Sequence, residues 1–139
     1  NGTLYSKPSK SSLPISDVVL NNIVKKIGNL GHWGEFILPD GRKGYLHNND
    51  YSTNKLDYKS NQTIILDIAK TSKKMIGTPY LWGGNSTKGS DCSGFTQLIF
   101  KSEGISLPRD ARQQALLGIS IRRDQLSVGD LLFFGTITI

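Results

Sequence analysis

The chain has 139 residues, of which 37% are hydrophobic and 20% charged, the composition of a folded protein of one or two small domains. Its net charge of +6 favours an anionic partner, but its lysines and arginines occur in scattered pairs without interleaved aromatic residues, which argues against nucleic acid. No apolar run approaches the roughly 18–20 residues that span a bilayer, so no transmembrane segment is predicted.

Residues 1–52 have the pattern of a small β-domain. Short β-prone segments alternate with turn signals such as Pro39-Asp40-Gly41-Arg42, and they cover residues 3–5, 17–20, 23–27, 33–38 and 43–46. Five short strands in this length predict a small β-barrel. We expect Trp33 to lie in its core because so small a barrel needs large side chains to fill it. The alternative is that Trp33 and Tyr45 form a binding surface.

Residues 53–61 are polar and predict a linker. Helical periodicity begins after them, with apolar residues on one side of a predicted helix over 62–76 that Gly77 ends. Further helices are predicted over 93–103 and 109–117. The four apolar residues 131–134 predict a strand that is buried on both faces. Residues 62–139 are therefore predicted to form a second, α+β domain.

Cys92 is the only cysteine, so the chain has no internal disulfide, and a cysteine-rich zinc site is excluded. Asp91 and Ser90 before it are good N-cap residues, which places the thiol in the first turn of a helix. Such settings lower the pKa of a cysteine from about 8.5 to roughly 3.5–7.5 and favour the nucleophilic thiolate. The alternative is a small, buried apolar residue. No metal site is expected at His32 and His47, because neither has a second ligand at metal spacing. No cofactor is predicted.

Four segments in a fixed order carry a family resemblance. They read Tyr-Leu-Trp-Gly-Gly at 80–84, Asp-Cys-Ser-Gly at 91–94, Leu-Pro-Arg-Asp at 107–110 and Leu-Ser-Val-Gly-Asp-Leu-Leu-Phe-Phe at 126–134. This order resembles the NlpC-type, papain-like cell-wall cysteine peptidases. Residues 4–8 and 40–46 resemble a bacterial SH3-like domain, which often precedes such a catalytic domain. The resemblance implies an SH3-like barrel over 1–52, a linker over 53–61 and the N-terminal part of a papain-like domain over 62–139.

The same resemblance implies an endopeptidase that cleaves peptidoglycan stem peptides between γ-D-glutamate and an L-diamino acid, in the bacterial cell envelope. Cys92 is then the nucleophile. Family members often hold the ammonium group of an N-terminal L-alanine with acidic and hydroxyl groups, and the matching positions here are Tyr80, Asp91, Ser93 and Asp110. Ala111 stands where some members have a serine. In this pairing the SH3-like barrel binds the wall or shapes one side of the substrate cleft.

One element of the family pattern is missing. The family takes its catalytic histidine from a strand downstream of the segment that matches 129–134, whereas His32 and His47 lie upstream. We therefore expect that the C-terminal part of the catalytic domain is absent and that these 139 residues alone are not a working peptidase. Two other functions stay open: a non-catalytic wall-binding protein, and a papain-like amidase or acyltransferase.

Overall fold

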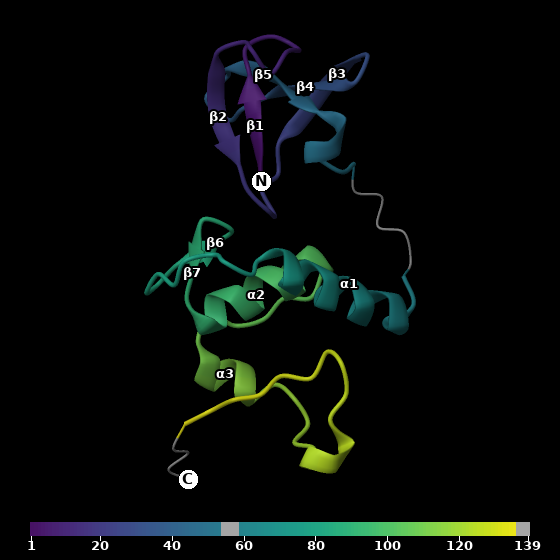
Figure 1. The fold of residues 1–139 in the computed structure, drawn as a ribbon, viewed down its shortest axis with the longest axis vertical. Coiled ribbons are helices and arrows are strands. Elements are labelled where there is room, and N and C mark those ends of the chain that lie inside the picture. Colours follow the sequence, from purple (N-terminus) through teal and green to yellow (C-terminus); the bar gives the residue numbers. More distant parts are fainter. Residues whose placement is uncertain (54–58, 136–139) are drawn as a thin grey trace. The chain divides into compact units, whose positions relative to one another are not determined.

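The computed structural model describes residues 1–53 and 59–135, which fall into two structural units, one on each side of residues 54–58. Most of the predicted linker over 53–61 lies outside the described residues, as does the predicted continuation of a strand over 136–139. Among the helices that the structure describes, none combines the length and the apolar character needed to cross a membrane. Each unit is described below by itself (Figure 1).

The N-terminal unit is an antiparallel sheet with the strand order β2-β1-β5-β4-β3 (Figure 1). The strands are β1 (Gly2–Tyr5), β2 (Pro14–Val18), β3 (Lys25–Leu30), β4 (Trp33–Ile37) and β5 (Lys43–His47), and a short 3-10 turn, η1 (Asn48–Asp50), follows. All five predicted strands are present, but two are displaced along the chain. The second begins earlier, at Pro14, because the first residue of a strand at the sheet's edge needs no N–H for the ladder. The third begins later because the chain turns at Asn21, whose φ is 68°.

One face of this sheet forms the core of the unit. Strand alternation turns Leu4, Phe36 and Leu46 to that face, where they are almost fully buried. The expectation that Trp33 fills the core is wrong, because Trp33 is three residues from Phe36 and so points to the opposite face of β4. There its ring packs edge-on against those of Tyr5 and His47, at centroid distances of 5.9 and 5.3 Å.

The second unit begins with helix α1 (Asn61–Lys74), which confirms the helix predicted over 62–76. The Ser60 side chain caps it by accepting a hydrogen bond from the Thr63 N–H. The remaining elements are β6 (Asn85–Ser86), β7 (Gly89–Ser90), α2 (Cys92–Ser102), α3 (Ala111–Ala115) and the 3-10 turn η2 (Arg123–Gln125). Helices α1 and α2 pack together, and they supply the buried apolar residues of this unit: Ile68, Leu98 and Ile99, with Met75 just after α1.

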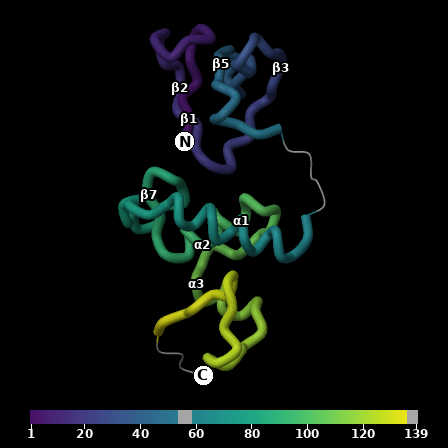
Figure 2. The backbone as a smooth tube through the Cα atoms, turned by 45° about the vertical axis from the view of Figure 1, so that its right-hand side comes forward, coloured from purple at the N-terminus to yellow at the C-terminus, as the bar shows by residue number. Residues whose placement is uncertain are grey.

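The strand predicted over 131–134 is not formed. These residues have no regular structure, and Leu132 and Phe134 are 61% and 92% exposed. A strand needs a neighbour for its ladder hydrogen bonds, and in the described part of this unit the only paired strands are the two-residue β6 and β7. The chain after α3 instead runs through η2 as an irregular segment (Figure 2).

Candidate active site

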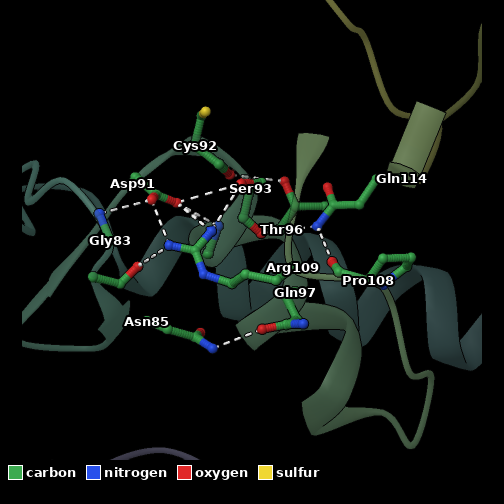
Figure 3. A network of polar contacts seen from close by, with 12 residues as sticks. Gly83, Asn85, Asp91, Cys92, Ser93, Thr96, Gln97, Pro108, Arg109 and Gln114 are labelled. Carbon is green, nitrogen blue, oxygen red and sulfur yellow. Dashed lines mark hydrogen bonds and ion pairs between the residues drawn. The ribbon is translucent and has the colours of Figure 1, made fainter. Parts of the chain in front are cut away.

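The start of α2 presents the Cys92 thiol. Asp91 is the N-cap, and its side chain accepts a hydrogen bond of 2.7 Å from the Gly94 N–H. Asp91 has an extended backbone, so its side chain does not follow the rotation of the helix, which begins at Cys92. Asp91 and Ser93 are 8% and 7% exposed, and Cys92 is exposed. Figure 3 shows the sulfur atom pointing away from the polar network beneath it.

At the centre of that network is an ion pair between Asp91 and Arg109. The guanidinium donates to both carboxylate oxygens, and its contact with Asp91 Oδ1 is 2.9 Å long. The carboxylate also accepts from the backbone N–H groups of Gly94 and Gly83. Arg109 first, and then the Gly94 N–H, lower the pKa of Asp91 to about 2, so the carboxylate is charged at neutral pH.

The glycine turn before α2 lies directly against the helix start. The Asp91 N–H donates to the Gly84 carbonyl at 3.2 Å, and a Cβ atom on Gly94 would lie only 2.2 Å from that same oxygen. Gly94 therefore has no room for a side chain. Gly83 has a φ of 76°, a conformation that favours glycine. These contacts explain why glycines stand on both sides of the cysteine.

The segment that precedes this turn brings Tyr80 to the site. The Leu81 N–H donates to the Ser90 carbonyl at 3.1 Å, and the Ser90 N–H donates to the Pro79 carbonyl at 3.3 Å. Residues 79–81 are thus bonded to the residue two positions before Cys92. The Tyr80 side chain itself is 65% exposed.

Gln114 of α3 fixes the other side of the site. It is 4% exposed, and its amide donates to the carbonyls of Ser93 and Pro108 at 3.0 and 2.8 Å. Gln97 of α2 donates to the Leu107 carbonyl at 2.7 Å. These bonds hold the loop that carries Arg109 against the first turns of α2 (Figure 3).

The five predicted site residues all lie in the second unit. Cys92, Asp91 and Ser93 lie in the first turn of α2, and Tyr80 lies in the adjacent segment. Asp110 is exposed at the start of α3, where its side chain makes no capping hydrogen bond.

The two histidines lie elsewhere, in the N-terminal unit. Their ring centroids are 6.5 Å apart, and His47 also accepts a hydrogen bond from the Asn49 N–H. No group of three or more His, Cys, Asp or Glu side chains within residues 1–53 and 59–135 is arranged to hold a metal ion.

Sequence reasoning missed Arg109 and Gln114. Arg109 was part of the Leu-Pro-Arg-Asp match, but no role was assigned to it. The available signal was its place beside Asp110 in a segment that also contains a predicted substrate-binding residue. For Gln114 the sequence carried no comparable signal, because the adjacent Gln113 is a residue of the same type. Only the structure shows that Gln113 is exposed and Gln114 is buried.

Comparisons with known proteins agree with the resemblance in the second unit. Residues 77–139 match the model of the NlpC/P60 family. The chain is 41% identical over 102 residues to a γ-D-glutamyl-L-lysine dipeptidyl-peptidase of Bacillus cereus, covering 70% of this chain and 29% of that protein. It is 53% identical over 68 residues to a protein of the same name from Bacillus subtilis, covering 49% of this chain and 23% of that protein.

A solved structure is also similar. The crystal structure of an NlpC/P60 family protein from Bacillus cereus superposes with a TM-score of 0.75 at 32% identity, covering 92% of this chain and 42% of that one. The predicted α+β class and the similarity to NlpC-type peptidases are therefore confirmed. The chain spans less than half the length of each of these three relatives.

Proposed function

We propose that the protein is a cysteine peptidase that cleaves between γ-D-glutamate and an L-diamino acid in peptidoglycan stem peptides. The match of residues 77–139 to the NlpC/P60 family and the names of the two Bacillus relatives support this reaction. The observation that carries it is the exposed thiol of Cys92 at the first position of α2, between two buried polar residues. Its substrates would be peptidoglycan-derived peptides, encountered in the bacterial cell envelope.

In the proposed reaction, the Cys92 sulfur attacks the γ-glutamyl carbonyl carbon. The oxyanion that forms is stabilised at the N-terminus of α2, where the first N–H groups, including that of Cys92, have no acceptor within the helix. The C–N bond then breaks, the amine leaves with a proton, and water hydrolyses the thioester to regenerate the thiol. Both histidines lie in the N-terminal unit, so we propose that the proton donor comes from outside residues 59–135.

For substrate binding, we propose that Tyr80 and Asp110 contact the ammonium group of an N-terminal L-alanine directly. Both side chains are exposed, and within the described residues the Asp110 carboxylate accepts no hydrogen bond. A bound ammonium needs such a carboxylate to offset its desolvation. Asp91 and Ser93 also belong to the predicted set, but their oxygen atoms already bond to Arg109. We propose that these two act by shaping the site.

We propose that the N-terminal unit is an SH3-like domain that binds the wall or forms one side of the substrate cleft. Five short antiparallel strands support this assignment. The sheet face opposite the core carries half-buried Tyr5, Trp33 and Tyr45, which supports a binding role for that face.

The test uses two substrates and the Cys92→Ala variant. One is L-Ala-γ-D-Glu-L-Lys; the other is the p-nitroanilide of L-Ala-γ-D-Glu, whose leaving amine needs little protonation. We expect the wild-type protein to release p-nitroaniline or to gain the mass of the acyl group on Cys92, and the variant to do neither. Acetylation of the substrate's N-terminus should lower kcat/KM at least about tenfold if the ammonium is bound. Absence of cleavage and of acylation with both substrates, with binding to purified peptidoglycan retained, would overturn the proposal in favour of a non-catalytic wall-binding protein.

A further inference from the structure

Arg109 connects three segments of the chain that surround Cys92. Its guanidinium donates to the Asp91 carboxylate, which precedes the cysteine, and to the Ser93 hydroxyl, which follows it, the latter at 2.9 Å. A longer contact of 3.5 Å reaches the Gly84 carbonyl in the glycine turn. One side chain from the loop before α3 thus touches both neighbours of the thiol and the turn packed beneath them (Figure 3).

The shape of the guanidinium makes this arrangement possible. Its planar fork carries five donors, so it can pair with both oxygens of Asp91 while the nitrogen that faces Oδ1 also reaches Ser93. A lysine ammonium is a compact charge that cannot occupy these positions together. Only 35% of the Arg109 side chain and 10% of the Asp91 side chain are exposed, so solvent competes only partly for these bonds.

The ion pair between Asp91 and Arg109 also sets the net charge next to the Cys92 thiol. Asp91 is the residue directly before Cys92, and an unpaired carboxylate there would repel a thiolate. Arg109 neutralises that carboxylate, and the pKa of Arg109 is raised mainly by its bonds to Asp91. Asp110 and Cys92 make smaller electrostatic contributions to the pKa of Arg109 in the same direction.

We infer that Arg109 is a positioning residue for the nucleophile: it holds Asp91 and Ser93 inward, so that Cys92 points outward, and it cancels the charge of the Asp91 carboxylate beside the thiolate. This inference rests on the proposed function for the assignment of Cys92 as nucleophile. Arg109 acts through Asp91 and Ser93 and need not touch the substrate.

The test measures how fast iodoacetamide alkylates Cys92 in the folded protein at neutral pH. Because Cys92 is the only cysteine, the rate reports on this thiol alone, and iodoacetamide is uncharged. The variants are Arg109→Met, Arg109→Lys, the double variant Asp91→Asn with Arg109→Met, and Arg112→Met as the control. Arg112 is exposed on α3 and differs from Arg109 in lying outside the network. Circular dichroism checks that each variant is folded.

We expect Arg109→Met to react at least roughly fivefold more slowly than wild type, the effect of one unpaired charge a few ångströms away in water. The double variant should recover most of that loss, because it lacks the unpaired carboxylate. Arg109→Lys should lie between wild type and Arg109→Met, and Arg112→Met should match wild type.

Several results would overturn the inference. One is that folded Arg109→Met is alkylated at the wild-type rate. Another is that Arg112→Met loses as much of the alkylation rate as Arg109→Met, which would indicate a general effect of net charge. If Arg109→Met does not fold, Arg109→Lys decides, since a wild-type rate there would mean that the fork geometry is not needed. Alkylation requires no peptidase activity. Failure of the hydrolysis assay above would therefore sink the proposed function without deciding this inference.

Discussion

The close approach of Gly94 to Gly84 predicts that Gly94→Ala destabilises the second unit. The new Cβ atom would lie 2.2 Å from the Gly84 carbonyl oxygen and 2.9 Å from Asp91 Oδ1, whereas real Cβ contacts almost never fall below 3.0 Å. The nearer atom belongs to the backbone, so no side-chain rotation relieves the contact. The glycine turn and the start of α2 must move apart by most of an ångström.

The expected change in the free energy of unfolding of Gly94→Ala has three contributions. Overpacking of this kind costs about 1–3 kcal/mol. The movement also weakens the hydrogen bonds from Asp91 N–H to Gly84 and from Gly94 N–H to Asp91, each worth about 1 kcal/mol. Alanine regains about 0.5–1 kcal/mol through its higher helix propensity. The net prediction is a decrease of about 2–3 kcal/mol in the free energy of unfolding.

Urea unfolding followed by far-ultraviolet circular dichroism measures this change, because all described α-helices belong to the second unit. The matched control is Gly118→Ala, since a Cβ atom on Gly118 would have no heavy atom within 4 Å apart from those of Gly118 and its two chain neighbours. That variant should stay within about 0.5 kcal/mol of wild type, as for most surface substitutions. If the two variants have the same stability, the contact between the glycine turn and α2 is not as described.

Two further changes test the polar network. Gln114→Leu should lower the free energy of unfolding by about 1–3 kcal/mol, because it leaves the buried Ser93 carbonyl and the half-buried Pro108 carbonyl without that donor. The exposed Gln113→Leu should change it little, and equal effects of the two variants in thermal unfolding would contradict this. Because the pKa of Asp91 falls from 3.8 to about 2 in the folded state, its charge stabilises the fold above about pH 4, and this contribution is lost as the pH falls toward 2. The difference in melting temperature between wild type and Asp91→Asn should therefore shrink from pH 5 to pH 2, and a constant difference would contradict the pairing with Arg109.

The elements with strong local signals could be predicted from the sequence. The helix over 62–76, the N-cap at Asp91 and the number of strands in residues 1–52 all follow from periodicity, capping and turn residues. The location of Trp33 could not, because it depends on which of the two faces of the sheet becomes the core, and that face is the one that carries Phe36. The run 131–134 has the composition of a buried strand, but composition does not supply the partner strand that its ladder needs.

In the candidate site, too, the features set by local sequence could be predicted and those set by distant contacts could not. The place of Cys92 at the helix start is a local property, and it was predicted. The role of Arg109 depends on a contact across 18 residues of sequence, which no local pattern encodes. Asp91 was predicted to cap the helix or to bind substrate, and the structure shows it capping the helix and pairing with Arg109.

The dependence of Asp91 on Arg109 and Gly84 limits how this thiol can be used in protein design. A graft of Asp-Cys-Ser-Gly alone onto the start of a foreign helix would reproduce the cap and the outward thiol. It would also leave an unpaired carboxylate beside the sulfur and a glycine with no carbonyl to pack against. A working transplant has to carry three separate stretches, the glycine turn, the helix start and the loop with Arg109, and the host scaffold must bring them together. The smallest portable unit is therefore a tertiary arrangement rather than a linear motif.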